Sequence, residues 1–218
     1  MTLLDYYYNN IKLDSSKYNN IHVSFGTDLN YMLISLITIA SLLKNSSPET
    51  FIHLHSLLLD CSFEDIQHIY NLKKINKNVD FIFYNAKQAE YDFERGRKEP
   101  RGIGEYTRLL IPHIVNNTNR IIILDTGDLI VNRDLSELYF FDIEDNYFVF
   151  SLEDAAGRYL PDIIFSRSNF YFNGGVCLVN VRKFREDNLY KNAFFTSIAY
   201  SNLPSPYQDI LLVISNYN

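Results

Sequence analysis

Residues 120–128 read Arg-Ile-Ile-Ile-Leu-Asp-Thr-Gly-Asp, an apolar run that ends in two carboxylates beside a glycine. The run predicts a buried strand over 120–124, and open α/β sheets bind their ligands at the carboxyl ends of such strands. The hard carboxylate oxygens of Asp125 and Asp128 suit Mg²⁺ or Mn²⁺ bridged to a diphosphate, and Gly127 leaves room for phosphate oxygens. The alternative is an Asp-Gly turn whose carboxylates only cap backbone amides.

The residues before this run alternate between strand and helix patterns. Ser62 and Asp65 have the spacing of a capping box and therefore mark the start of a helix. The expected elements are strands at 21–25, 51–59 and 79–84, a turn at 26–28, and helices at 30–43 and from Ser62 to about residue 71. This order predicts an α/β fold, with a parallel sheet that carries helices on both faces.

The patterns around and after the run are less regular. Residues 86–101 are expected to form a surface excursion, and Asn173-Gly-Gly175 marks a bulge or a close backbone approach. We expect helices at 106–115 with a possible kink at Pro112, at 184–200, and from Pro206 to 212, with strands at 147–152 and 171–181. Since no repeat, linker or break in composition occurs, we expect one domain over 1–218, with 1–20 as an N-terminal extension.

The composition narrows the functional classes. The chain has 218 residues, with 20 Lys+Arg against 26 Asp+Glu, which gives a net charge of −6. This balance argues against a protein that binds nucleic acids or anionic membranes, because both need clustered Lys and Arg. Cys61 and Cys177 cannot build a disulfide scaffold or a thiolate zinc site. Because the N-terminus lacks a signal-peptide pattern and the apolar stretch 31–43 is too short to span a bilayer, we expect a cytoplasmic protein.

Other polar residues each allow two interpretations. Asp28 and Asn30 follow the first strand and could bind a nucleobase edge, or Asn30 could be an N-cap with Asp28 complementing the helix dipole. Arg108 could neutralise a phosphate, or it could be solvated or paired like most helical arginines. The polar segment 207–209 is by itself only a helix start.

Taken in order, these segments resemble the family-eight retaining glycosyltransferases of the GT-A fold. The resemblance runs from about residue 20 to 212, and its collinearity makes it specific although each motif is short. The matching segments are Phe25-Gly-Thr-Asp-Leu-Asn-Tyr31, Tyr106-Thr-Arg-Leu109, Ile123-Leu-Asp-Thr-Gly-Asp-Leu-Ile-Val131 with Asp134-Leu-Ser-Glu-Leu138, Phe172-Asn-Gly-Gly-Val-Cys-Leu-Val-Asn-Val181 and Tyr207-Gln-Asp-Ile-Leu211.

The resemblance implies a GT-A-like, Rossmann-related mixed sheet flanked by helices. It also implies transfer of a hexose from a UDP-sugar to a carbohydrate acceptor with retention of anomeric configuration, and Mn²⁺ or Mg²⁺ held by Asp125 and Asp128. Gln208 would lie beside the anomeric carbon, Asp209 would shape that pocket, and Asp154 would contact the donor sugar. The positions that match the family's donor site are Thr27, Asp28, Asn30, Tyr31, Arg108, Asn173 and Gly174.

Three features depart from the family pattern. The carboxylates are spaced Asp-x-x-Asp where the family usually has Asp-x-Asp, and Tyr207 replaces the first Asp of an Asp-Gln-Asp segment. The chain also ends at Asn218, before the family's C-terminal segment with a metal-binding His and a diphosphate-binding Lys. A nucleotide-sugar-binding remnant without turnover is therefore an alternative. A haloacid-dehalogenase-type phosphatase with Asp125 as nucleophile is another, although that family carries its Asp early in the chain.

Overall fold

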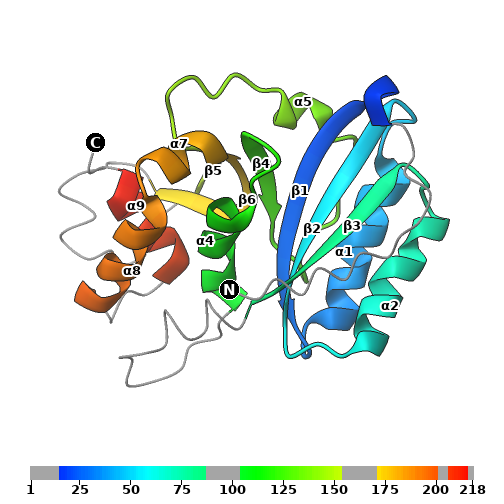
Figure 1. The fold of residues 1–218 in the computed structure, drawn as a ribbon, viewed down its shortest axis with the longest axis horizontal. Helices are drawn as coiled ribbons and strands as arrows, with labels where there is room; N and C mark the ends of the chain where they lie inside the picture. The colour runs from blue at the N-terminus through cyan, green and yellow to red at the C-terminus, as the bar shows by residue number, and fades with distance from the viewer. Residues whose placement is uncertain (1–14, 87–103, 154–170, 201–205, 216–218) are drawn as a thin grey trace.

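The computed structural model describes residues 15–86, 104–153, 171–200 and 206–215, which form one sheet covered by helices (Figure 1). The strands are β1 (Asn19–Asp28), β2 (Thr50–Leu59), β3 (Val79–Asn85), β4 (Arg120–Leu124), β5 (Phe148–Glu153) and β6 (Tyr171–Asn180). The helices are α1 (Met32–Asn45), α2 (Phe63–Asn71), α4 (Gly104–Ile114), α5 (Ser136–Tyr139), α7 (Val181–Glu186), α8 (Leu189–Ala199) and α9 (Pro206–Ser215).

The six strands follow the spatial order β3-β2-β1-β4-β6-β5. β1 runs parallel to β2 and β4, and β2 runs parallel to β3, as the strand–helix alternation predicts. β6 is antiparallel to both of its neighbours, β4 and β5. The sheet is therefore mixed, which confirms the expected fold class of a single α/β domain.

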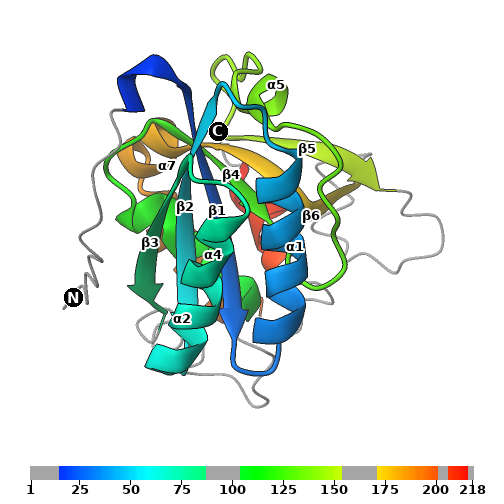
Figure 2. The same cartoon turned by 90° about the vertical axis from the view of Figure 1, so that its right-hand side faces the viewer.

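The apolar run in β4 is continuous because both faces of this central strand are buried. Ile121 and Ile123 point into a core shared with α4, α7, α8 and α9, whereas Ile122 and Leu124 point into a core shared with α1, α2 and α5. Figures 1 and 2 show these two helical layers on opposite sides of the sheet. Every residue of β4 after Arg120 is at most 3% exposed. The strand is therefore held firmly in the core, and the loop that begins at Asp125 starts from a fixed position.

Several local predictions are confirmed. Ser62 accepts a hydrogen bond from the Asp65 amide and Asp65 accepts one from the Ser62 amide, so a capping box opens α2. Pro206 is the first residue of α9, and Pro112 lies inside α4. Separately from these predictions, no helix in the described ranges is both long and apolar enough to cross a membrane.

Two predicted boundaries are wrong. The expected turn at 26–28 is strand, because parallel pairing with β2 continues to Asp28 opposite Leu59. The expected helix at 184–200 is two helices, α7 and α8, because Asn188 adopts a left-handed conformation with φ 54° between them. Asn tolerates this region better than most residues, so the break can form there. Most of the expected excursion at 86–101 and most of the 1–20 extension lie outside the described residues.

Candidate active site

The loop after β4 is bound to the end of β1 by a chain of hydroxyl groups. The parallel register, with Ser24 opposite Ile123, brings both strand ends to one edge of the sheet. Ser35 Oγ in α1 lies 2.8 Å from Thr27 Oγ1 and 2.9 Å from Thr126 Oγ1. Thr126 Oγ1 is also 3.3 Å from the Gly26 carbonyl oxygen. These contacts fix the Asp125–Asp128 loop against β1 and α1.

Asp125 lies at the centre of this edge and pairs with Arg108 of α4. Its Oδ1 lies 2.5 Å from an Arg108 terminal nitrogen and also accepts the Thr126 amide at 3.0 Å. The Arg108 guanidinium lies 5.1 Å from the ring centre of Tyr207, and burial raises the pKa of the Tyr207 phenol well above its usual range. The Asp125 carboxylate and the Tyr207 ring therefore both contribute to holding the Arg108 guanidinium in place.

The donor set at this loop fits a divalent ion that a substrate helps to hold. Within the described residues, Asp125 Oδ2 accepts no hydrogen bond, and the exposed Asp128 carboxylate forms no hydrogen bond or ion pair. No group of three His, Cys, Asp or Glu in these residues could hold a metal. Mg²⁺-type ions are commonly held by one or two carboxylates together with substrate phosphates, so the two carboxylates match that pattern.

Gly127 gives the loop its shape. Its φ of 120° is a conformation that side-chain-bearing residues rarely adopt. A Cβ at this position would lie 3.6 Å from Ile34 and 3.7 Å from the Tyr31 ring. The half-exposed Tyr31 therefore lies directly beside the loop of Asp125 and Asp128.

Asp28 stabilises the turn between β1 and α1. Asp28 Oδ1 accepts the backbone amides of Asn30 at 2.9 Å and Tyr31 at 3.1 Å. The N-cap of α1 is Tyr31, which makes no capping bond with its side chain, so the interpretation of Asn30 as the N-cap is wrong. Asn30 is exposed, whereas Thr27 is only 3% exposed and contacts Ser35. Of these residues, Asn30 and Tyr31 therefore present the most accessible side chains.

The Asn173-Gly-Gly175 segment forms the bulge that its glycines predict. The pairing of β5 with β6 shifts between Phe150 and Ser151, and Asn173 Oδ1 accepts the Gly175 amide at 2.8 Å. The Gly175 carbonyl accepts the Asp125 amide at 2.6 Å. The bulge thus lies against Asp125, although it is 48 residues away in the sequence.

The first turn of α9 packs on the same bulge. A Cβ on Gly174 would lie 3.0 Å from both Gln208 Cγ and Tyr207 Cε1, so only glycine fits there without a shift. Gln208 Nε2 donates to the Phe172 carbonyl at 2.8 Å, which fixes the orientation of its amide. Gln208 is therefore held beside the β6 bulge that contacts Asp125.

Asp209 lies in the first turn of α9. Asp209 is completely buried and accepts a hydrogen bond from the Tyr171 hydroxyl at 2.9 Å. In this position it anchors α9 to β6 and is not accessible from the surface. Asp154 lies outside the described residues.

Sequence reasoning missed the hydroxyl chain and the role of Tyr207. Ser35 stands in an otherwise apolar segment of α1 and is completely buried. A buried hydroxyl in an apolar helix needs a partner, so its position is a signal of a contact with another element. Tyr207 carried no such signal, because its burial under Arg108 depends on how α4, α9 and β6 meet.

Comparison with known proteins points to one family. The family model described as "Glycosyl transferase family 8" matches residues 22–217. A curated Haemophilus influenzae protein named "Putative glycosyltransferase" is 25% identical over 195 residues, covering 87% of this chain and 57% of the relative. The chain therefore spans little more than half the length of that relative.

The solved structures agree on the fold. A galactosyltransferase, LgtC, in complex with donor and acceptor sugar analogues matches with a TM-score of 0.75 at 25% identity, covering 89% of this chain and 70% of LgtC. A bifunctional glycosyltransferase, WbbM, matches with a TM-score of 0.75 at 20% identity, covering 95% of this chain and 38% of WbbM. GlyE of Streptococcus pneumoniae matches with a TM-score of 0.67 at 21% identity, covering 90% of this chain and 44% of GlyE.

Proposed function

This chain belongs to glycosyl transferase family 8, and we propose that it transfers a hexose from a UDP-sugar to a carbohydrate acceptor with retention of anomeric configuration. The observation that carries the proposal is the meeting of Asp125, Arg108, the β6 bulge and Gln208 at the carboxyl end of β4. This is the edge at which α/β sheets bind nucleotides. The family assignment also argues against the phosphatase alternative.

The nucleoside would bind where β1 passes into α1. Asn30 offers an exposed amide, and Tyr31 offers a ring that is 55% exposed beside Gly127. Asp28 keeps Oδ2 as an acceptor, because its two backbone bonds both go to Oδ1. One acceptor and one amide suit the imide edge of uracil better than a purine edge. We therefore propose UDP as the nucleotide.

The diphosphate would lie over the loop of Asp125 and Asp128. Mn²⁺ or Mg²⁺, held by these two carboxylates, would supply Lewis acidity to the leaving diphosphate. Arg108 already faces Asp125 with one terminal nitrogen, and its charge would also attract phosphate oxygens. Gly127 adds no side chain that would obstruct this approach. The residues of the loop thus serve to bind and orient the leaving group.

Gln208 would act at the anomeric carbon. Its amide nitrogen donates to the Phe172 carbonyl, and this bond holds the side chain beside the β6 bulge. An amide oxygen can stabilise positive charge on a sugar ring without being a strong nucleophile. Asp209, hydrogen-bonded to Tyr171, is a positioning residue that holds this turn of α9. Asn173, which is exposed, would line the donor sugar, whereas Gly174 is buried under the first turn of α9.

The test is UDP affinity with Mn²⁺ and in chelator, measured by calorimetry in wild type and in Asp128→Asn. We expect wild type to bind UDP at least tenfold more weakly in chelator, about 1.4 kcal/mol. Asp128→Asn should lose this dependence and keep the metal-free affinity, because Asp28 and Asn30 are unchanged. Asp145→Asn, another exposed carboxylate, is the matched control and should behave as wild type.

Two outcomes would contradict parts of the proposal. Equal UDP affinity with Mn²⁺ and in chelator would leave the carboxylate pair as a turn and remove the metal from the mechanism. Metal-dependent UDP binding without any transfer or slow hydrolysis of UDP-hexoses would support the binding remnant instead. Where product forms, the anomeric proton coupling in its NMR spectrum reports retention or inversion.

A further inference from the structure

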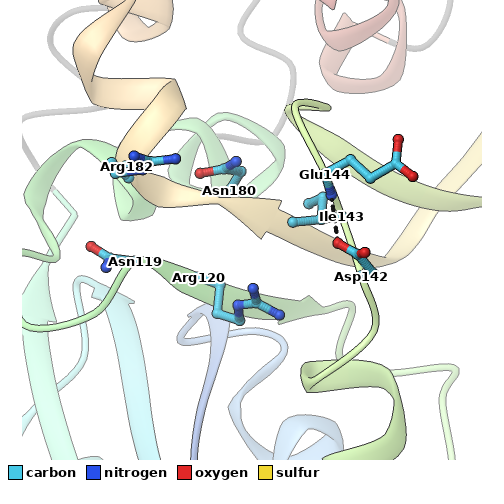
Figure 3. Close-up of a pocket in the computed structure, with 7 residues that line it drawn as sticks. All are labelled: Asn119, Arg120, Asp142, Ile143, Glu144, Asn180 and Arg182. Carbon is cyan, nitrogen blue, oxygen red and sulfur yellow. Dashed lines mark hydrogen bonds between the residues drawn. The ribbon is translucent and has the colours of Figure 1, made fainter.

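A polar groove lies at the opposite edge of the sheet from Asp125. It consists of two hollows of about 250 and about 520 Å³ that share Asn119 and Arg182 as lining residues. One extends between Arg120 at the start of β4 and the loop after α5, and the other extends along α7. Figure 3 shows the first hollow, with Asp142 and Glu144 on the loop across from Arg120 and Asn180. The larger hollow lies within the range of about 300–1,000 Å³ that is typical of small-molecule sites.

The groove is separate from the proposed donor site. Arg120 begins β4 and Leu124 ends it, so four strand steps of about 3.3 Å place the two edges roughly 13 Å apart. In Figure 1, α5 and α7 lie at the edge where β1 begins, whereas α1 starts at the other edge. A sugar bound in the groove would therefore not touch Asp125 or Gln208.

The charges of the groove favour a neutral ligand. Its lining contains three arginines and three carboxylates, namely Arg120, Arg182, Arg185, Asp142, Glu144 and Glu186. A phosphate or another anion would be attracted by the arginines but repelled by as many carboxylates. A neutral ligand with many hydroxyl groups can donate to the carboxylates and accept from the arginines at the same time. Balanced charges thus argue against a nucleotide and for a carbohydrate.

The carboxamides of the groove support the same ligand class. Four asparagines line it, and each carboxamide carries both a donor and an acceptor, as a pair of neighbouring sugar hydroxyls does; they are Asn116, Asn119, Asn180 and Asn188. Within the described residues, the side chains of Asn116, Asn119 and Arg182 form no hydrogen bond or ion pair. These groups are available to a ligand without breaking a contact of the protein.

The walls of the groove are fixed before any ligand binds. One terminal nitrogen of Arg120 donates to the carbonyls of Tyr139 at 3.0 Å and Phe141 at 3.1 Å. The Asn119 carbonyl accepts the amides of Val181 at 2.9 Å and Arg182 at 3.3 Å. A preformed wall loses little conformational entropy on binding, which favours affinity in a shallow site.

We infer that this groove is a second, non-catalytic carbohydrate site, which binds a neutral stretch of a glycan chain away from its reacting end. The inference rests on the proposed function only in taking glycans as the substrate class. A glycan held there would remain close to the transferase site, which raises its effective concentration at Asp125 and Gln208.

The test is native gel electrophoresis in gels that contain dextran, galactan or mannan, with polygalacturonate as the anionic comparison. We expect at least one neutral polysaccharide to retard the wild-type protein, and Arg182→Ala and Asn119→Ala each to weaken this binding at least fivefold. Arg133→Ala is the matched control, because Arg133 is an exposed arginine outside the groove. Arg182 and Asn119 are exposed, so we expect both variants to keep the wild-type melting temperature, which is measured alongside.

Three outcomes would overturn the inference. The first is that none of the neutral polysaccharides retards the wild-type protein. The second is that polygalacturonate retards it more strongly than the neutral polysaccharides do, and the third is that wild type and Arg182→Ala are retarded equally. Retardation that disappears on addition of UDP would also contradict it, since the ligand would then lie in the donor site. Failure of the proposed function is recognised separately, because UDP calorimetry on the same protein does not involve the groove.

Discussion

At the scale of single residues, Gly174 is the point where β6 and the first turn of α9 meet in the candidate site. Its Cα faces the first turn of α9 so closely that an added methyl would lie 3.0 Å from Gln208 and Tyr207. Tyr207 is completely enclosed between this glycine and Arg108 and therefore cannot move aside easily. The position of Gln208 thus depends on the absence of a side chain in β6.

We predict that Gly174→Ala destabilises the protein by about 1–3 kcal/mol, because the methyl overpacks a closed contact. It should also lower turnover more than it lowers UDP affinity, since the displaced turn carries Gln208, whereas the residues proposed to bind the nucleoside lie at the end of β1 and in the turn before α1. Urea unfolding and calorimetry with UDP measure the two effects. Val176→Ala, on the same strand, is the control for a change of volume without a clash. Wild-type stability and turnover in Gly174→Ala would contradict the packing argument.

At the scale of elements, β1 and β2 carry a network of three histidines at the sheet edge away from Asp125. His22 Nδ1 lies 2.9 Å from His55 Nε2, and His22 stacks on His53 with ring centres 4.5 Å apart. Burial lowers the pKa of His22 to about 3, with the neighbouring His53 as a second cause, and it lowers the pKa of His55 well below the usual range. The folded protein therefore keeps these imidazoles neutral.

We predict that stability falls as the pH is lowered through and below 6.5. The folded pKa of His22 lies below its unfolded value of 6.5, so the unfolded chain binds more protons between pH 6.5 and about 3. At pH 5 this amounts to roughly 2 kcal/mol for His22, from about 1.4 kcal/mol per pH unit. Urea unfolding at pH 7.5 and pH 5 measures the loss.

The variant His22→Gln should show a smaller loss between these two pH values, because one titrating imidazole has been removed. His68→Gln is the matched control, because it removes an exposed imidazole of α2 and keeps all three imidazoles of the network. Its loss between the two pH values should remain that of wild type. An equal loss in wild type and His22→Gln would show that other groups cause the acid sensitivity.

At the scale of the whole molecule, the sheet is the wall between two cores. β4 and β6 contribute alternate residues to both, with Cys177 in the core under α9 and its neighbour Leu178 in the core under α1. If one helical layer unfolded alone, it would expose one face of the central strands to water while their other face stayed buried. The two cores should therefore unfold together.

We predict that Ile39→Ala in α1 and Ile210→Ala in α9 each lower the free energy of unfolding by about 2–5 kcal/mol, since both side chains are at most 1% exposed. In both variants, fluorescence and circular dichroism should follow one coincident transition. Two separate transitions, or a variant that shifts only one of two probes, would show that the layers are independent. Ile75→Ala, at an exposed position, is the control.

The sequence alone predicted the elements that local patterns specify. The apolar run of β4, the capping box at Ser62 and the start of α9 at Pro206 are properties of neighbouring residues, and all three are confirmed. The order of the motifs was sufficient to identify the family. The predictions were wrong where pairing with a distant strand overrides a local signal, as at Gly26–Asp28, which pair with β2.

The arrangement of the site depends on contacts that no local pattern contains. Arg108 and Asp125 come from α4 and the end of β4, and the Gly175 carbonyl that binds Asp125 comes from an antiparallel strand far along the chain. The sequence by itself determined which side chains could take part in chemistry, because residue types and their spacing are properties of the sequence. Only the tertiary structure decided that Asp209 is buried while Asp128 is exposed, since burial depends on which elements pack together.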